Sequence, residues 1–138
     1  MKAVKILLIA ALVYAGIVVA FETLIGTLQP ANEATIVITT VEPDGTSYNR
    51  VVSRLESDGK LYVAANHWPR AWFERALANP DVKATVDGTT SEFRAVPVTG
   101  AEFDRVNTEH ALPLVFRVLT GFPPRLLLRL DPRPPAVS

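Results

Sequence analysis

Three arginines are the residues whose type and spacing best suit the binding of an anion. Arg50 and Arg54 are four positions apart in a segment rich in β-branched residues. Side chains that are an even number of positions apart lie on the same face of a strand. Guanidinium groups bind phosphate and carboxylate groups through paired hydrogen bonds. We therefore predict an anion clamp, which Arg70 could join from the start of the next helix. The alternative is a solvated strand face on which Arg50 and Arg54 pair with Glu56 or Asp58.

A short polar segment lies between Arg54 and Arg70 in the sequence. Asn66, His67 and Trp68 stand between an expected strand and an expected helix. Helix N-termini carry free N–H groups and the positive end of the helix dipole, so anions bind there, and a histidine could donate to a substrate oxygen or a cofactor ring. Alternatively, Asn66 or His67 caps the helix backbone and Trp68 packs at the core edge. The predicted cofactor-binding residues are therefore Arg50, Arg54, Asn66, His67, Trp68 and Arg70, and the sequence identifies no catalytic residue.

Composition excludes several other kinds of chemistry. The chain has no cysteine, which excludes disulfides, thiolate metal sites and a cysteine nucleophile. The two histidines, His67 and His110, are far apart in the sequence, and no ligand spacing completes a metal site with them. The 14 basic and 14 acidic residues balance, whereas nucleic-acid-binding domains usually have a basic excess. The sequence also contains no P-loop, catalytic triad order or paired-carboxylate motif.

Short strands must position these residues. Residues typical of β-structure predict strands at 34–40, 47–56, 60–65, 81–86, 92–98 and 125–130, with turns at 42–46, 57–59 and 87–88. Helical spacing predicts a helix over 69–78, and Thr99 with Glu102 forms a capping-box pattern for a second helix. Residues 113–119 fit either a helix or a strand. About six short strands with few helices indicate a mainly β domain of the α+β kind, closed as a small barrel.

The N-terminal segment is of a different kind. Residues 6–21 are all apolar or glycine, and the run continues weakly to residue 28. A helix of roughly 20 such residues crosses the hydrocarbon core of a bilayer. We therefore predict a membrane anchor over 1–28, a linker over 29–33, the barrel domain over 34–130 and a proline-rich tail over 131–138. A cleaved signal peptide and a helix buried in a soluble core are the alternatives.

Flanking charges predict how the anchor is oriented. Lys2 and Lys5 precede the apolar run, and the first charged residues after it are acidic. The positive-inside rule then places the N-terminus in the cytoplasm. The chain would be a single-pass membrane protein with its domain on the other side.

Residues 72–82 carry a resemblance to a known family. Trp72-Phe-Glu-Arg-Ala-Leu-Ala-Asn-Pro-Asp-Val82 resembles the signature Pro-x-Trp-Tyr-x-Asn-Leu-x-Ala-Asn-Pro-x-Val of the deazaflavin-dependent nitroreductases, with Phe73 for Tyr and Ala76 for Asn. The preceding strand and residues 98–102 extend the resemblance over about residues 34–130. It implies a split β-barrel related to the flavin-binding pyridoxamine-phosphate oxidases.

The resemblance also implies a function. Members of this family are reductases. Together with the predicted anchor, this implies a membrane-tethered oxidoreductase that uses deazaflavin (coenzyme F-420) or FMN to reduce a quinone or a nitro compound. We also expect membrane lipid as a partner and a homodimer as the assembly. The family's basic phosphate-binding loop corresponds here to residues 42–46, where Glu42 and Asp44 would repel phosphate. The alternative is therefore a barrel that binds no cofactor and serves as an accessory or partner-binding membrane subunit, because fold alone does not decide function.

Overall fold

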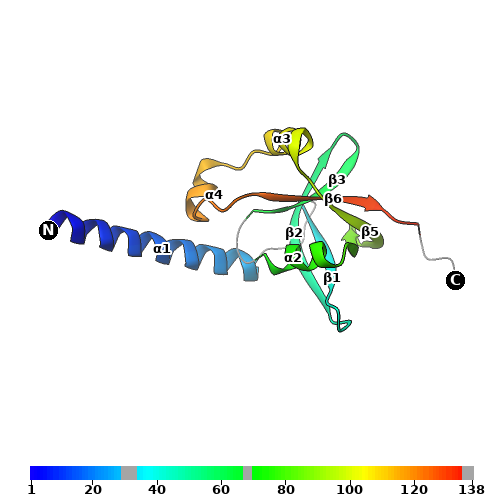
Figure 1. Cartoon of the computed structure of the whole chain (residues 1–138), viewed down its shortest axis with the longest axis horizontal. Coiled ribbons are helices and arrows are strands. Elements are labelled where there is room, and N and C mark those ends of the chain that lie inside the picture. Colours follow the sequence, from blue (N-terminus) through cyan, green and yellow to red (C-terminus); the bar gives the residue numbers. More distant parts are fainter. Residues whose placement is uncertain (29–33, 67–69, 135–138) are drawn as a thin grey trace.

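A helix that projects from a β domain gives this molecule its shape (Figure 1). The structure, a computed structural model, describes residues 1–28, 34–66 and 70–134. The elements in chain order are α1 (Lys2–Leu28), β1 (Thr35–Val41), β2 (Ser47–Ser57), β3 (Lys60–Ala65), α2 (Ala71–Ala78), β4 (Asp81–Val86), β5 (Thr89–Pro97), α3 (Gly100–Glu109), α4 (Leu114–Leu119) and β6 (Leu126–Pro132).

The six strands form a closed antiparallel barrel in the order β1-β2-β3-β6-β5-β4. Pairing of β1 with β4 closes the ring, with Val37 opposite Thr85. Two of the hairpins turn where predicted, and Asp58-Gly59 and Asp87-Gly88 have positive φ at both positions, as a tight two-residue hairpin turn requires. The predicted fold class, a small six-stranded barrel with short helices behind one apolar N-terminal helix, is confirmed.

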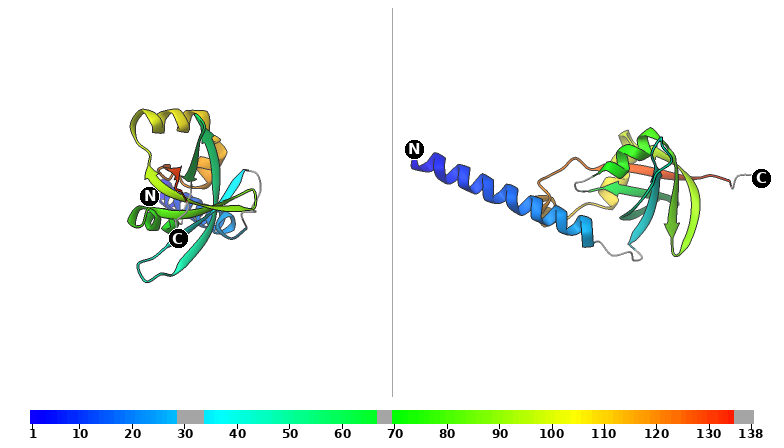
Figure 2. Two further views of the ribbon diagram at one scale, coloured as in Figure 1. Left: turned by 90° about the vertical axis from the view of Figure 1, so that its right-hand side faces the viewer. Right: turned by 90° about the horizontal axis from the view of Figure 1, so that it is seen from below.

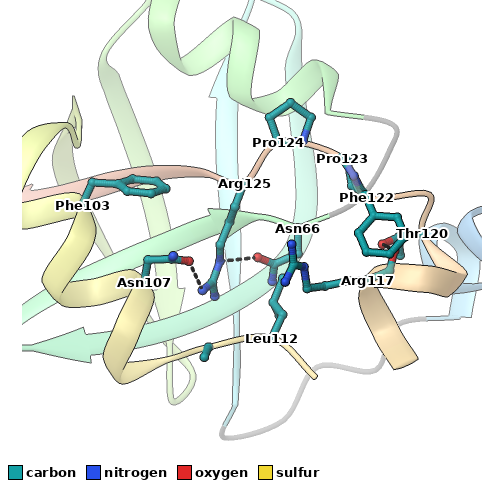
Figure 3. Close-up of a pocket in the computed structure, with 11 residues that line it drawn as sticks. Asn66, Phe103, Asn107, Leu112, Arg117, Thr120, Phe122, Pro123, Pro124 and Arg125 are labelled. Carbon is teal, nitrogen blue, oxygen red and sulfur yellow. Dashed lines mark hydrogen bonds between the residues drawn. The ribbon is translucent and has the colours of Figure 1, made fainter. Parts of the chain in front are cut away.

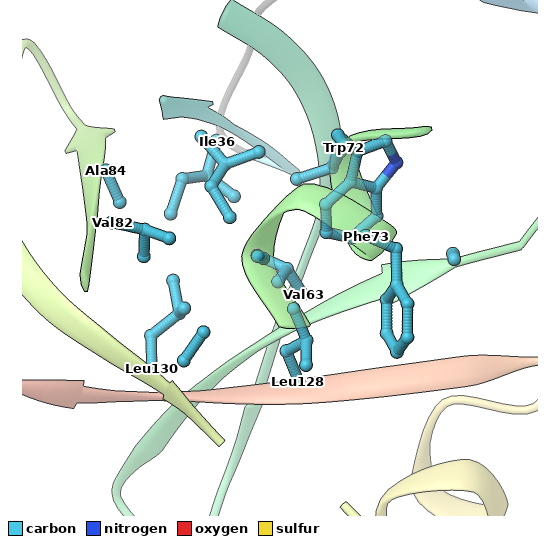
Figure 4. Close-up of a cluster of buried hydrophobic side chains, with 13 residues drawn as sticks. Ile36, Val63, Trp72, Phe73, Val82, Ala84, Leu128 and Leu130 are labelled. Carbon is cyan, nitrogen blue, oxygen red and sulfur yellow. The ribbon is translucent and has the colours of Figure 1, made fainter. Parts of the chain in front are cut away.

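The barrel interior holds the main hydrophobic core (Figure 4). Burial alternates along β1, so that Ile36 and Ile38 point inward, which is the period-two pattern of a strand with one buried face. Helix α2 adds Trp72 and Phe73 to this core, with their rings 5.7 Å apart in an edge-to-face arrangement. This packing fixes α2 against β1 and β5.

A second apolar cluster holds α3 on the outside of the barrel. Val106 of α3 is fully buried beside Tyr62 and Leu127, and Phe103 packs against them. Arg129 of β6 donates from Nη1 to both carboxylate oxygens of Glu102, at 2.8 and 2.9 Å. These contacts fix the helix face that forms one wall of the site.

Some details of the structure differ from the prediction, and one that the sequence left open is decided. Thr99 occupies the N-cap position of α3, but its side chain makes no capping hydrogen bond. The carboxylate of Glu102 accepts hydrogen bonds from Arg129. The ambiguous segment 113–119 forms the helix α4. Strand β6 continues to Pro132, two residues into the predicted tail, because β5 offers it a further partner in Phe93.

Helix α1 is long and apolar enough to cross a membrane. The span Lys2–Ile25 has 24 residues and a mean hydropathy of 2.6, and none of its most apolar window is buried by the rest of the chain. This exposure argues against the interpretation as a core helix. The helix contacts α4, and Figure 2 shows the two helices beside the same end of the barrel.

Candidate functional site

A cavity of about 410 Å³ lies between α3, α4 and the start of β6 (Figure 3). Small-molecule sites in proteins have volumes of roughly 300–1,000 Å³, so the cavity has the size of a ligand pocket. None of its lining residues is acidic. They are Asn66, Phe103, Asn107, Ala111, Leu112, Arg117, Thr120, Phe122, Pro123, Pro124 and Arg125.

Arg125 is the central polar residue of this pocket. Its Nε donates to Asn66 Oδ1 at 2.8 Å, and its Nη1 donates to Asn107 Oδ1 at 3.1 Å and to the His110 carbonyl oxygen at 2.7 Å. All three acceptors are neutral, and burial lowers the pKa of Arg125. Within the described residues no carboxylate forms an ion pair with it. A partly buried cation that has only neutral partners favours an anionic ligand.

Asn66 connects this arginine to the barrel. Antiparallel pairing of β3 with β6 places Ala65 opposite Leu126, so the next residue of each strand, Asn66 and Arg125, meet at the barrel end. Asn66 is buried, and its Nδ2 donates to Ser53 Oγ at 3.1 Å while its Oδ1 accepts from Arg125. An amide side chain suits this place because it offers a donor and an acceptor together.

Arg117 provides a second guanidinium group at the pocket. It is exposed on α4, and its Cζ lies 5.5 Å from the centroid of the Phe122 ring. In the part of the chain that the structure describes, its side chain forms no ion pair. Two cations and no acid in one cavity give a positive local potential, which attracts anions.

The predicted arginine clamp is not assembled in one place. Arg54 donates from Nη2 to Glu56 at 2.7 Å and lies 3.4 Å from Asp87, and the hydrogen bond with Glu56 raises the pKa of Arg54. This is the pairing with Glu56 that the sequence offered as the alternative. Arg50 lies on a separate small cavity with Ser53, Asn66 and Trp72, of about 10 Å³, which has room for about one water molecule.

Arg70 has a different position again. It occupies the N-cap of α2, is 4% exposed, and donates from Nη1 to the Pro124 carbonyl oxygen at 2.7 Å. Burial lowers the pKa of Arg70, and the charge of Glu22 in α1 acts in the opposite direction. Arg70 thus supports the pocket from behind the Pro124 backbone. His67 and Trp68 lie outside the described residues, so the proposed role of both remains a prediction.

Asn66 is the predicted site residue that lies on the large pocket, whereas Arg125, Asn107 and Arg117 were missed. Arg125 had a weak signal in the sequence, since it is a lone charge between Pro123-Pro124 and an apolar run. Asn107 and Arg117 gave none, because a single polar residue on a helix is ordinary. Their relevance follows only from the cavity that they share.

Comparison with known proteins identifies the fold alone. No family model and no curated protein matches the sequence. The structure resembles an F420-H2 dependent reductase (TM-score 0.56, 16% identity, 73% of this chain and 96% of the other). It also resembles HutZ, the heme storage protein from Vibrio cholerae (TM-score 0.59, 15% identity, 83% and 87%), and a FAD-binding protein from Mesorhizobium loti (TM-score 0.51, 18% identity, 73% and 80%). The split-barrel fold that the sequence resemblance implied is therefore confirmed, and this fold serves several cofactors.

The pocket is electrostatically more favourable for an anionic group than the β1–β2 turn is. In that turn Asp44 accepts from the Thr46 backbone N–H at 2.9 Å, which lowers the pKa of Asp44 and keeps it charged. Glu42 lies 3.8 Å from Arg75. Two carboxylates repel phosphate there, whereas Arg125 and the exposed Arg117 offer charge-assisted donors.

Proposed function

We propose that this chain is a membrane-anchored oxidoreductase that binds a flavin-type cofactor, deazaflavin (F-420) or FMN, in the Arg125 pocket and reduces a quinone or a nitro compound. One observation carries the proposal: Arg125 is a partly buried cation with neutral partners on the wall of a ligand-sized cavity. The fold shared with the F420-H2 dependent reductase supports it. Anchoring through α1, with the N-terminus in the cytoplasm, is part of the proposal.

Each part of the pocket has a role in this proposal. Arg125 and Arg117 bind the phosphate or carboxylate groups of the cofactor tail. Asn66 and Asn107 hold the Arg125 guanidinium in place, and this preorganisation reduces the entropy lost on binding. Phe103 and Phe122 give apolar surface for a ring system. The bound cofactor supplies hydride transfer, while the protein supplies position and electrostatics.

The test is cofactor binding by the purified full-length chain in detergent. F-420 and FMN are each titrated, and binding is followed by the quenching of their fluorescence. Saturable binding that weakens on loss of the Arg125 charge supports the proposal. Absence of binding by either cofactor contradicts it.

A separate observation supports a second candidate function. The β1–β2 turn carries Glu42 and Asp44. The resemblance to the deazaflavin-dependent nitroreductases implies a basic phosphate-binding loop at this place. This difference favours an accessory membrane subunit that has the barrel and no cofactor. A folded, membrane-bound chain that binds neither F-420 nor FMN would support this second candidate.

A further inference from the structure

Helix α4 and the residues after it expose a large apolar surface. Leu114 is 65% exposed, Val115 70%, Val118 38% and Phe122 51%. We call these four side chains the α4 face. Contiguous exposed apolar side chains on a small protein mark a contact with a membrane or another macromolecule.

The α4 segment lies directly beside α1. Tyr14 of α1 donates from its hydroxyl to the Val118 carbonyl oxygen at 2.7 Å, and the rings of Phe21 and Phe116 meet edge to face with centroids 6.0 Å apart. Gly121 comes so close to Val18 that a Cβ on the glycine would lie 3.2 Å from Val18 Cγ1. The exposed surface of α1 therefore continues into the α4 face.

These contacts fix the depth of α4 relative to any bilayer that α1 crosses. A helix rises about 1.5 Å per residue, so Tyr14 stands about 16 Å before the end of the apolar span at Ile25. The hydrocarbon core is about 30 Å thick, which places Tyr14 near its midplane and Phe21 in the leaflet next to the domain. The α4 segment, which contacts both residues, must then lie inside that leaflet.

Two hydroxyl groups near the α4 face have the partners that such a position requires. In hydrocarbon each hydroxyl must find a partner within the protein. The Tyr14 hydroxyl has the Val118 carbonyl, and the Thr120 hydroxyl donates to the Phe116 carbonyl at 2.9 Å. The Arg117 guanidinium carbon lies 5.5 Å from the centroid of the Phe122 ring, and both side chains line the pocket.

We propose that the α4 face inserts among the acyl chains of the leaflet next to the domain, so that the Arg125 pocket opens toward the bilayer at Phe122 and Arg117. The occupant of this surface is lipid, because the face continues the apolar surface of α1. The inference rests on the proposed anchoring by α1 and adds a second membrane contact. It gives a lipid-soluble substrate a direct path from the bilayer to the pocket.

The test uses the absence of cysteine from the chain, which lets single nitroxide labels be attached without background. Full-length variants Val115→Cys, Leu12→Cys and Ser91→Cys are labelled and placed in phosphatidylcholine–phosphatidylglycerol vesicles. Leu12 reports on α1, and the exposed Ser91 on β5 reports on water. We expect the labels at 115 and 12 to show high accessibility to oxygen and several-fold lower accessibility to a nickel chelate than the label at 91.

The two proposals fail in different ways. A label at 115 that is as accessible to nickel as the label at 91, with the label at 12 in lipid, overturns the inference and leaves the anchor intact. Labels at 12 and 115 that are both open to nickel overturn the anchor together with the inference. A label at 115 that is shielded from both reagents and broadened by a neighbouring spin would show a second copy of the chain on the α4 face, which also overturns the lipid contact.

Discussion

Asn66 and Arg125 are 59 positions apart in the sequence, yet Arg125 Nε donates to Asn66 Oδ1 at 2.8 Å. This bond sets the direction of the one pocket-lining arginine that is partly buried. It also leaves the guanidinium charge uncompensated, because an amide has no net charge. The anion binding that we propose for the pocket depends on this neutral partner.

Replacing Arg125 tests the charge directly. Arg125→Gln keeps a hydrogen-bonding side chain and removes the cation, so we expect F-420 or FMN to bind about 10- to 100-fold more weakly, which corresponds to the roughly 1.5–3 kcal/mol of a charge-assisted hydrogen bond. The control is Arg94→Gln, because Arg94 is exposed and pairs with Asp81 on the barrel surface. Equal affinity of both variants and the unchanged protein would contradict a role for Arg125.

A carboxylate at position 66 tests whether the pocket depends on the uncompensated charge of Arg125. Asn66→Asp provides Arg125 with a carboxylate at the position of the present 2.8 Å bond. We expect anion binding to be lost while the melting temperature stays the same or rises, because the ion pair satisfies the guanidinium internally. Fluorescence titration and thermal unfolding measure the two properties. Retained cofactor affinity in a folded variant would show that the pocket does not use the free charge.

The ion pair that holds α3 predicts a dependence of stability on pH. The hydrogen bonds from Arg129 lower the pKa values of Glu102 and Asp131 from their ordinary 4.5 and 3.8. A carboxyl whose pKa is lowered by folding stabilises the fold above its ordinary pKa, and this contribution is lost as the pH falls through the lowered value. Because Glu102 is partly exposed, with 28% of its side chain accessible, we expect Glu102→Gln to cost only about 0.5–1 kcal/mol near neutral pH.

Thermal unfolding at a series of pH values provides the measurement. The melting temperatures of the Glu102→Gln variant and the unchanged chain should differ near pH 7 and approach each other as the pH falls below 4.5, the ordinary pKa of Glu102. A difference that is constant over this range would mean that the charge of Glu102 does not contribute.

The α2 helix allows a matched comparison of core and surface. Trp72 is 5% exposed within the barrel core, whereas Leu77 on the same helix is 45% exposed. We expect Trp72→Ala to lower the free energy of unfolding by about 3–5 kcal/mol and Leu77→Ala by about 0.5 kcal/mol or less. Urea unfolding of both variants checks this, and similar losses would argue against the described packing of α2.

Fractionation of cells tests the anchor. The exposed apolar span Lys2–Ile25 predicts that the full-length chain stays with membranes through high-salt and carbonate washes. N-terminal sequencing of the same sample is the control, because a mature chain that begins after about residue 20 would identify a signal peptide. Release of the full-length chain by carbonate would rule out an integral helix.

The strands, turns and helices that could be predicted from the sequence depend on local residue patterns. The alternation of Thr35–Val41, the Asp58-Gly59 turn and the helical spacing around Trp72 each depend on neighbours a few residues away. These features therefore predicted strands, hairpins and α2 close to their observed bounds. The apolar run of α1 required no tertiary contact to be recognised, since length and composition suffice.

The site was decided by tertiary structure. Strand periodicity shows that Arg50 and Arg54 share a face, but it does not show that Asp87, 33 positions after Arg54, approaches and pairs with it. Likewise, Asn66 meets Arg125 only because β6 enters the ring between β3 and β5. A side chain's direction is a local property, whereas the partner that neutralises its charge depends on the order in which distant strands close the barrel.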